Sequence, residues 1–518
     1  WNQNCMQNKN YQPIIYSLIL IIGIVLGSKV INNSETENYK SKAKVNAILQ
    51  LIDDNYVDAL NLEEFEEKVI NSIMRELDPH SVYVSKKEFS YQEATMNGSF
   101  SGVGIEFNII EDTIVVITPI SGGPSEKLGI KSGDRIVEVE DENIAGIGID
   151  NNGVIDRLRG EKDSKVNVKI KRRGSENLIE YDIVRGDIPL YSVDASFILE
   201  ENIGYIKVNR FAATTNREFY EASVKLLQNG MQKLILDLRG NGGGYLHAAI
   251  YMCNEFLEDD NLIVYTEGRN RKRENVYSDE EGNLKNIELI ILIDDGSASA
   301  SEIVAGCMQD NDRATIIGKR SFGKGLVQEE VKLADGSAVR VTTQRYYTPV
   351  GRCIQKPYGA SDKEYYLEQF TREENESYPD SLKFETKSGK VVYGGGGITP
   401  DIVIVKDTNM TFTKINYVFG WIEEFCLIEK KSVNNEIGED YKVFEKQPFE
   451  KGIYTDFVKF VSEKDKDFDF TLTTMQEDYL KNFLKARVAR SIWGEEVYRK
   501  ILIQNDDYIS KALELLNQ

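Results

Sequence analysis

Apolar residues recur with different periods along the chain, and each change of period marks a predicted domain. Between residues 34 and 96 they repeat at spacings of three and four, as in Val45, Ile48 and Ile52, which predicts helices. The sequence Asp78-Pro79-His80-Ser81 then breaks the helical pattern, because proline does not fit a helix interior.

From about residue 97 to residue 188 the pattern changes to short strands separated by glycine turns. Apolar runs predict strands at 113–117, 134–139 and 166–171, and one short helix is predicted at 154–158. Short strands at this spacing predict a small β-domain.

Beyond residue 189 the strands become continuous apolar runs, each followed by a helical pattern, up to about residue 405. The two clearest pairs are a strand at 234–238 with a helix at about 245–257, and a strand at 289–293 with a helix at about 299–309. Continuous apolar strands are typical of a sheet covered on both faces, so this region predicts an α/β core with a parallel or mixed sheet.

The N-terminus carries an apolar stretch, residues 14–31, whose length lies between that of a signal-peptide core and that of a membrane span. A buried core helix is the alternative, but a helix that is apolar on every side and followed by a polar run has little to pack against. No clear Ala-x-Ala cleavage site follows, so we expect an uncleaved anchor. The rest of the chain would then lie outside the cytoplasm, on the periplasmic side of the inner membrane.

The pattern as a whole predicts a multidomain α+β protein. Its expected parts are a signal or anchor segment at 1–33, a helical region at 34–96, a β-domain at 97–188, an α/β core at 189–405, and an accessory, mostly helical segment at 406–518.

Composition removes several classes of function. The 518 residues include 63 Lys and Arg against 84 Asp and Glu, a net charge of −21, and such a surface would repel nucleic-acid phosphates. The chain has two histidines and five scattered cysteines, without a CxxC or HExxH motif, so neither a zinc site nor a disulfide framework is expected. If the chain is an enzyme, we expect its base to be a residue other than histidine.

A glycine loop, Gly240-Asn241-Gly242-Gly243-Gly244, lies between a predicted strand and a predicted helix. It does not fit the dinucleotide-binding fingerprint, because Tyr245 stands where the last glycine belongs. Two readings stay open locally: a tight turn, or a backbone whose N–H groups face an anion or an oxyanion.

A second glycine-rich segment, 318–325, nearly matches a phosphate-binding loop, but Gly325 replaces the required serine or threonine. We therefore do not expect nucleotide hydrolysis. Lys324 lies between two glycines, and a base with a reference pKa of about 10.4 must sit in a dry site to be neutral near pH 7. Gln328 follows on the same side of the chain, where its amide could accept a hydrogen bond from that lysine.

The run Ser297-Ala298-Ser299-Ala300-Ser301-Glu302 opens a predicted helix. Ser299 and Glu302 satisfy the S-x-x-E pattern of a capping box, which is the local explanation. A serine at a helix N-terminus also lies where backbone amides can stabilise negative charge near its hydroxyl. The local pattern does not choose among the three serines.

Together these motifs resemble those of the carboxyl-terminal processing proteases, also called tail-specific proteases. The resemblance rests on the segments Leu77 to Ser81, Leu236 to Gly244, Ser297 to Glu302, Gln309-Asp310, Arg313-Ala314, Gly318 to Gln328 and Gly396 to Asp401. It implies that Ser299 is the nucleophile, Lys324 the base and Gln328 its positioning partner. It also implies an oxyanion hole made by the backbone N–H groups of Ala300 and Gly244.

The β-domain resembles a PDZ module, with Ser101-Gly102-Val103-Gly104-Ile105 as its carboxylate-binding loop. In such modules backbone N–H groups receive a chain-terminal carboxylate and the peptide adds as a strand. The helix at 154–158 would wall the groove. A β-domain that merely packs on the core is the alternative.

The resemblance implies a serine endopeptidase that binds the exposed C-terminal tails of proteins or peptides and cleaves them without a metal, nucleotide or other cofactor. Expected partners are such substrates and, through residues 14–31, a membrane; nucleic acid is not expected, and assembly into a homo-oligomer stays open. Two other hypotheses are a catalytically silent PDZ scaffold that binds tails for a partner, and a hydratase-like enzyme of small thioesters, because crotonase-like cores look similar.

Overall fold

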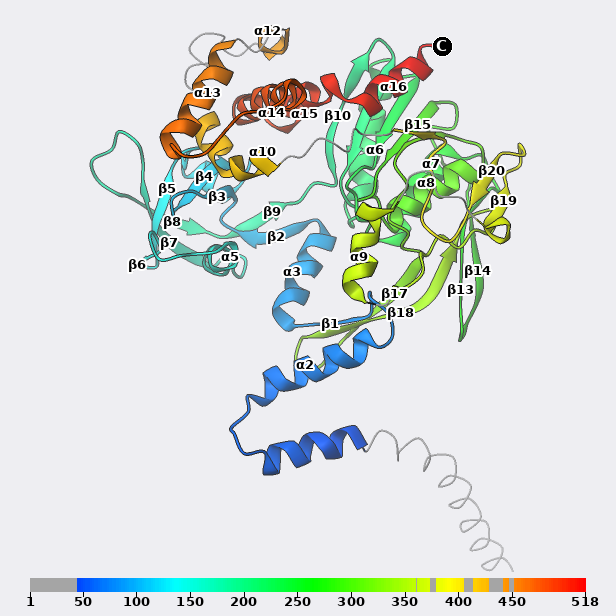
Figure 1. The fold of residues 1–518 in the computed structure, drawn as a ribbon, viewed down its shortest axis with the longest axis horizontal. Coiled ribbons are helices and arrows are strands. Elements are labelled where there is room, and N and C mark those ends of the chain that lie inside the picture. Colours follow the sequence, from blue (N-terminus) through cyan, green and yellow to red (C-terminus); the bar gives the residue numbers. More distant parts are fainter. Residues whose placement is uncertain (1–43, 360, 373–378, 405–412, 428–440, 447–450) are drawn as a thin grey trace, which may run out of the picture. The chain divides into compact units, whose positions relative to one another are not determined.

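The computed structural model describes residues 44–518, except 360, 373–378, 405–412, 428–440 and 447–450 (Figure 1). The predicted anchor at 14–31 lies outside the described residues, and none of the described helices is long and apolar enough to cross a membrane. The chain divides into a unit that ends at Glu76 and a unit from Leu77 to Gln518. In the first unit, residues 44–55 are helical and helix α2 spans Leu62–Arg75.

The predicted β-domain is an antiparallel sheet with strand order β3-β4-β5-β7-β8, and the short β6 pairs with β5. Its strands are β3 (Ile105–Ile109), β4 (Ile114–Pro119), β5 (Arg135–Val139), β6 (Glu142–Asn143), β7 (Lys165–Lys171) and β8 (Ile179–Val184), and its helices are α4 (Pro124–Lys127) and α5 (Asn151–Leu158). Val154 and Leu158 of α5 are buried against Val103 and the apolar face of the sheet. Strands β2 (Ser99–Gly102) and β9 (Gly186–Pro189) pair with each other, so the chain enters and leaves this domain side by side.

The core contains a six-stranded sheet with the order β10-β11-β12-β15-β16-β21, in which β10 is antiparallel and the other strands run parallel. The strands are β10 (Val193–Glu200), β11 (Ile203–Val208), β12 (Lys233–Asp237), β15 (Glu288–Ile293), β16 (Thr315–Gly318) and β21 (Ile402–Val403). Helices α6 (Thr215–Gln228), α7 (Leu246–Phe256) and α8 (Ala300–Asp310) are the crossovers. The mixed sheet predicted from the sequence is therefore present.

Both faces of this sheet are covered, which explains why its strands are continuous apolar runs. Leu234 and Leu236 of β12 pack with α6, α7 and α8, whereas Ile235 points to the opposite face. On that face lies helix α16 (Asp507–Leu516), which buries Ile509 and Ala512 against the sheet (Figure 1).

The position of α16 changes the interpretation of the C-terminal segment. The segment is helical, as predicted: its described helices include α10 (Thr413–Tyr417), α12 (Tyr441–Lys446), α13 (Lys451–Lys464), α14 (Thr474–Trp493) and α15 (Glu495–Leu502). Its end is not accessory, however, because α16 forms the second helical layer of the core. Charged residues in α16 led to its interpretation as accessory from the sequence.

A second sheet completes the core, with the order β1-β18-β13-β14 and with β17 also paired to β18. Its strands are β1 (Val82–Val84), β13 (Leu262–Gly268), β14 (Arg271–Tyr277), β17 (Leu326–Lys332) and β18 (Ala338–Tyr347). The segment after Gly325, which fitted a strand or a helix in the sequence, is thus strand β17. Helix α9 (Asp362–Thr371) and the hairpin of β19 (Lys383–Glu385) and β20 (Val391–Tyr393) follow β18.

Candidate active site

Ser299 occupies the N-cap position of α8 in an unusual backbone conformation, with φ 55° and ψ −112°. A residue with a side chain rarely adopts such a positive φ, and strained residues of this kind cluster at functional sites. The turn packs closely on the glycine loop, since a Cβ atom on Gly243 would lie 2.8 Å from the Cβ of Ser299. Gly243 therefore has to be glycine for the loop to reach the serine.

The Glu302 carboxylate joins the serine turn to the segment that carries Lys324. It is completely buried, and it accepts hydrogen bonds from the backbone N–H groups of Ser299 at 2.8 Å and Lys324 at 2.9 Å. Two further donors are the N–H of Gly323 at 2.7 Å and the hydroxyl of Ser321 at 2.5 Å. The sequence identified Glu302 as part of a capping box; its carboxylate does bind the Ser299 N–H, but it also binds a second segment of the chain.

Tyr346 provides a second connection between the same two segments. Its buried hydroxyl lies 3.1 Å from the carbonyl oxygen of Ser299 and 2.7 Å from that of Lys324, so it can donate to either. Burial raises the pKa of Tyr346 well above its usual value, which keeps the donor proton in place. No motif in the sequence marks this tyrosine, which lies on strand β18 of the second sheet.

Lys324 donates a hydrogen bond from Nζ to Oε1 of Gln328 at 2.8 Å. The Gln328 amide is oriented by its own donor, since Nε2 donates to the backbone carbonyl of His80 at 2.6 Å. Asp78 holds that carbonyl in position by accepting from the N–H groups of His80 and Ser81, each at 2.8 Å. The Asp78-Pro79-His80-Ser81 break in the helical pattern thus supports the lysine through its backbone.

The pKa of Lys324 is lowered from its ordinary value to about 8, mainly by burial and further by the positive charge of Arg340. A substantial fraction of this lysine is therefore neutral near pH 8, as a general base requires. Within the described residues, Lys324 Nζ and Ser299 Oγ are not hydrogen-bonded to each other. Their backbones are brought together, while the proton-transfer contact itself is not formed.

Aromatic side chains surround His80, the residue whose backbone carbonyl orients Gln328. His80 contacts the rings of Phe322, Tyr365 and Tyr366, and its Nε2 lies 2.8 Å from the Tyr365 hydroxyl. Burial, together with the charge of Lys324, lowers the pKa of His80 to about 4, so this histidine is neutral at pH 7. Tyr365 and Tyr366 belong to α9, which the sequence analysis did not identify.

A pocket of about 560 Å³ opens beside this aromatic group. Its lining includes Lys356, Tyr358, Tyr365, Leu367 and Glu368. The backbone N–H of Lys356 donates to the carbonyl of Gly323 at 2.9 Å, so the pocket wall lies one residue from the proposed base.

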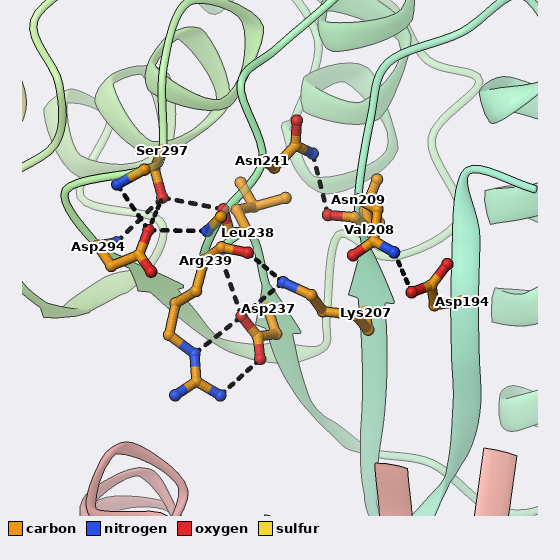
Figure 2. A network of polar contacts seen from close by, with 12 residues as sticks. Asp194, Lys207, Val208, Asn209, Asp237, Leu238, Arg239, Asn241, Asp294 and Ser297 are labelled. Atoms are coloured by element: carbon orange, nitrogen blue, oxygen red, sulfur yellow. Dashed lines mark hydrogen bonds and ion pairs between the residues drawn. The ribbon is translucent and has the colours of Figure 1, made fainter. Parts of the chain in front are cut away.

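The two predicted oxyanion donors lie at the glycine loop and at the start of α8. A Cβ atom on Gly244 would come within 2.1 Å of the Phe211 carbonyl oxygen, so no side chain fits there. Asn241 shapes the loop: its side chain donates to the Val208 carbonyl at 3.0 Å (Figure 2) and accepts from the Gly243 N–H at 2.9 Å. Within the described chain, the N–H groups of Gly244 and Ala300 make no backbone hydrogen bond, which leaves both available to a ligand.

The predicted carboxylate-binding loop, with Gly102, Val103, Gly104 and Ile105, leads into β3. Gly104 has φ 77°, and a Cβ atom there would lie 2.8 Å from Ile188. Among the described strands, β3 pairs with β4 on one side and has no strand partner on its other edge. An open edge beside a glycine loop and α5 is what strand addition by a peptide requires.

The remaining candidate groups lie elsewhere. His247 lies in the first turn of α7 and stacks on Tyr245 at 5.0 Å between ring centroids. In the described part of the chain, no three His, Cys, Asp or Glu side chains gather as metal ligands would.

Two family models and several known proteases match this chain. The model of peptidase family S41 matches residues 202–363, and the model of the PDZ domain matches residues 101–183. The carboxy-terminal processing protease CtpB of Bacillus subtilis is 32% identical over 326 residues, which cover 62% of this chain and 67% of the relative. A carboxy-terminal-processing protease of Bartonella bacilliformis is 35% identical, and the match covers 64% of this chain and 76% of the relative. CtpA of Bacillus subtilis is 31% identical, with coverages of 66% and 75%.

The site predicts how Lys324 titrates. Nζ-detected NMR of protein labelled with ¹⁵N-lysine, with the signal assigned by Lys324→Arg, is expected to show a midpoint near pH 8. Arg340→Gln removes a positive charge and should raise that midpoint. A midpoint near the ordinary lysine value, unchanged in Arg340→Gln, would contradict a dry site.

Proposed function

Because the chain belongs to peptidase family S41 and carries a PDZ domain, it is a C-terminal processing serine protease, and we propose that Ser299, Lys324 and Gln328 perform its chemistry. The observation that carries this proposal is the Glu302 carboxylate, one oxygen of which accepts from the N–H groups of both Ser299 and Lys324. That shared acceptor holds a serine and a buried lysine of lowered pKa in one site.

In the proposed first step, neutral Lys324 takes the proton from Ser299 Oγ while Oγ attacks the carbonyl carbon of the scissile peptide bond. The negative charge that develops on the carbonyl oxygen is stabilised by the N–H groups of Gly244 and Ala300. The C–N bond then breaks, and the Lys324 ammonium returns the proton to the leaving amine. Water, deprotonated by the same lysine, hydrolyses the acyl ester and regenerates Ser299.

Gln328 has a positioning role in this mechanism. Because its Nε2 is committed to the His80 carbonyl, its Oε1 faces the lysine and accepts from Nζ. A substrate in the site brings Nζ and Oγ into contact, as catalytic hydrogen bonds often tighten only when substrate is bound.

We further propose that the PDZ domain recruits the substrate by its C-terminal tail. The tail would add as a strand to the open edge of β3, with its carboxylate at the backbone N–H groups of residues 102–105. The glycines of this loop let the backbone approach the carboxylate closely.

The location of the protease is a separate proposal. We propose that residues 14–31 anchor the chain and that the catalytic part lies outside the cytoplasm; the apolar run itself supports this.

Loss of either dyad residue should abolish cleavage of an unfolded protein. We expect Ser299→Ala and Lys324→Ala to lower kcat/KM by roughly 10³-fold or more, because each removes a group that changes charge or bonding in the transition state. His247→Ala is the control and should stay within about twofold of the native protein, since that histidine takes no part in the proposed mechanism. Full proteolysis by Ser299→Ala, or loss of activity with a chelator but not in Lys324→Ala, would refute the mechanism.

Recognition of the tail can be tested with one peptide in three forms. Amidation of its C-terminus removes the carboxylate and should raise KM about tenfold with kcat little changed, the pattern expected when a remote binding contact is lost. Acetylation of its N-terminus is the matched control and should leave both constants unchanged. Equal KM values for the free and amidated peptides would contradict docking by the PDZ loop.

The anchor can be tested by fusing residues 1–33 to a reporter enzyme that folds only outside the cytoplasm. The fusion should be active and should sediment with membranes, whereas deletion of residues 14–31 should abolish both properties. Reporter activity without residues 14–31 would argue against this segment as the targeting signal.

A further inference from the structure

Arg239 immediately precedes the glycine loop that carries the proposed oxyanion donor. It lies two residues beyond the C-terminal end of β12, directly before residues 240–244. The guanidinium makes contacts that the chemistry itself does not require.

Asp237 is the centre of these contacts. Its buried carboxylate accepts from Nε of Arg239 at 3.0 Å, from Nη2 at 2.7 Å and from the Arg239 backbone N–H at 3.0 Å (Figure 2). It also accepts from the Tyr205 hydroxyl at 2.8 Å and from Nζ of Lys207 at 3.3 Å. Burial alone would raise the pKa of Asp237, but the charges of Arg239 and Lys207 hold it well below its usual range.

The carbonyl of Arg239 is held as well, since it accepts a hydrogen bond from Lys207 Nζ. The next residue, Gly240, donates its N–H to Asp294 at 2.7 Å, and Ser297 donates to the Leu238 carbonyl at 2.9 Å (Figure 2). The start of the loop is therefore tied both to the buried ion cluster and to the turn that leads to Ser299.

The third nitrogen of the guanidinium, Nη1, binds the C-terminal segment. Nη1 of Arg239 donates to Oδ2 of Asp506 at 2.7 Å, and the guanidinium carbon lies 4.7 Å from the centre of the Tyr508 ring. Asp506 is the N-cap of α16, and its Oδ1 accepts from the N–H of Tyr508 at 2.9 Å. One carboxylate thus caps α16 and binds the residue before the oxyanion loop.

We propose that Asp506 and Arg239 are positioning residues, through which the C-terminal helix α16 holds the oxyanion loop in its active geometry. The proposal rests on the proposed function of Gly244 and extends it to the end of the chain. Its physical basis is that every polar group of Arg239 is engaged, with one of its three side-chain nitrogens on α16. Loss of that contact leaves the guanidinium bound to Asp237 but removes its link to α16, so the loop that follows Arg239 loses the constraint that comes from the C-terminal helix.

The test compares Asp506→Asn with a matched control, Asp194→Asn, in the full chain. Asparagine is as good an N-cap as aspartate, so Asp506→Asn keeps α16 capped and removes the charge that binds Arg239. Asp194 forms a similar ion pair with Arg499 of α15 at 3.0 Å. The side chains of Asp194 and Arg499 are 18% and 23% exposed, close to the 20% and 17% of Asp506 and Arg239. Asp194 joins the same sheet to the same C-terminal segment but makes no hydrogen bond to residues 239–244.

We expect Asp506→Asn to lower kcat roughly tenfold with KM unchanged, because a displaced oxyanion donor affects the transition state more than the bound substrate. Affinity for a peptide boronate, whose adduct with the serine carries a tetrahedral oxyanion mimic, should fall in parallel with kcat. Asp506→Glu, which restores the carboxylate, should recover part of both. Asp194→Asn should keep kcat and boronate affinity within about twofold of the native values.

The inference is overturned if Asp506→Asn keeps native kcat, or if Asp194→Asn loses as much as Asp506→Asn, since either result would mean that the contact stabilises only the fold. Should Asp506→Asn unfold at the assay temperature, Asp506→Ser gives the same comparison, because serine also caps a helix without a charge. Native protein that binds no boronate at Ser299 would instead refute the proposed function, so the two failures are distinguishable.

Discussion

The active site depends on one buried carboxylate. Glu302 receives four hydrogen bonds from two segments of the chain, and all four donors are uncharged groups: three backbone N–H groups and the Ser321 hydroxyl. A buried carboxylate without such donors would be costly, so the serine turn and the 321–324 segment are each held where the donors are needed. Burial raises the pKa of Glu302, and the donors act against that shift. The backbone N–H groups of Ser299 and Lys324 thus hold the proposed nucleophile and the proposed base in position.

Around this contact the protein controls the charge of its lysine by excluding water. The rings of Phe322 and Tyr365 lie beside His80, and the neutral histidine adds no charge to the site. The pKa of Lys324 falls to about 8 mainly because the ammonium is buried. A histidine base has its ordinary pKa near neutrality, whereas a lysine base requires a site of this kind. Helix α9 therefore borders the site through its contacts with His80, although it follows the serine and the lysine in the chain.

Support for the glycine loop comes from still farther away. The loop is anchored at its start by the Asp237, Arg239 and Lys207 cluster (Figure 2). That cluster reaches Asp506, the N-cap of α16. The same helix covers the sheet face opposite α6, α7 and α8. The packing of the layers and the proposed positioning of the loop therefore depend on the same helix, and α16 is part of the protease core.

The sequence by itself determined the types of element and the candidate chemistry. Local periodicity separates the β-domain from the α/β core, because neighbouring residues determine backbone conformation. The ordered motifs around Ser299, Lys324 and Gln328 indicate the family by their spacing. The local pattern did not choose among Ser297, Ser299 and Ser301; the resemblance to the family did. Motif spacing could not show that Glu302 binds Lys324 as well as Ser299. The sequence likewise did not predict the contacts made by Tyr346, His80 and Asp506, nor the strands β13, β14 and β18. These were decided by the tertiary structure, since a contact between Arg239 and Asp506 across 267 positions leaves no local pattern and arises only when the layers pack.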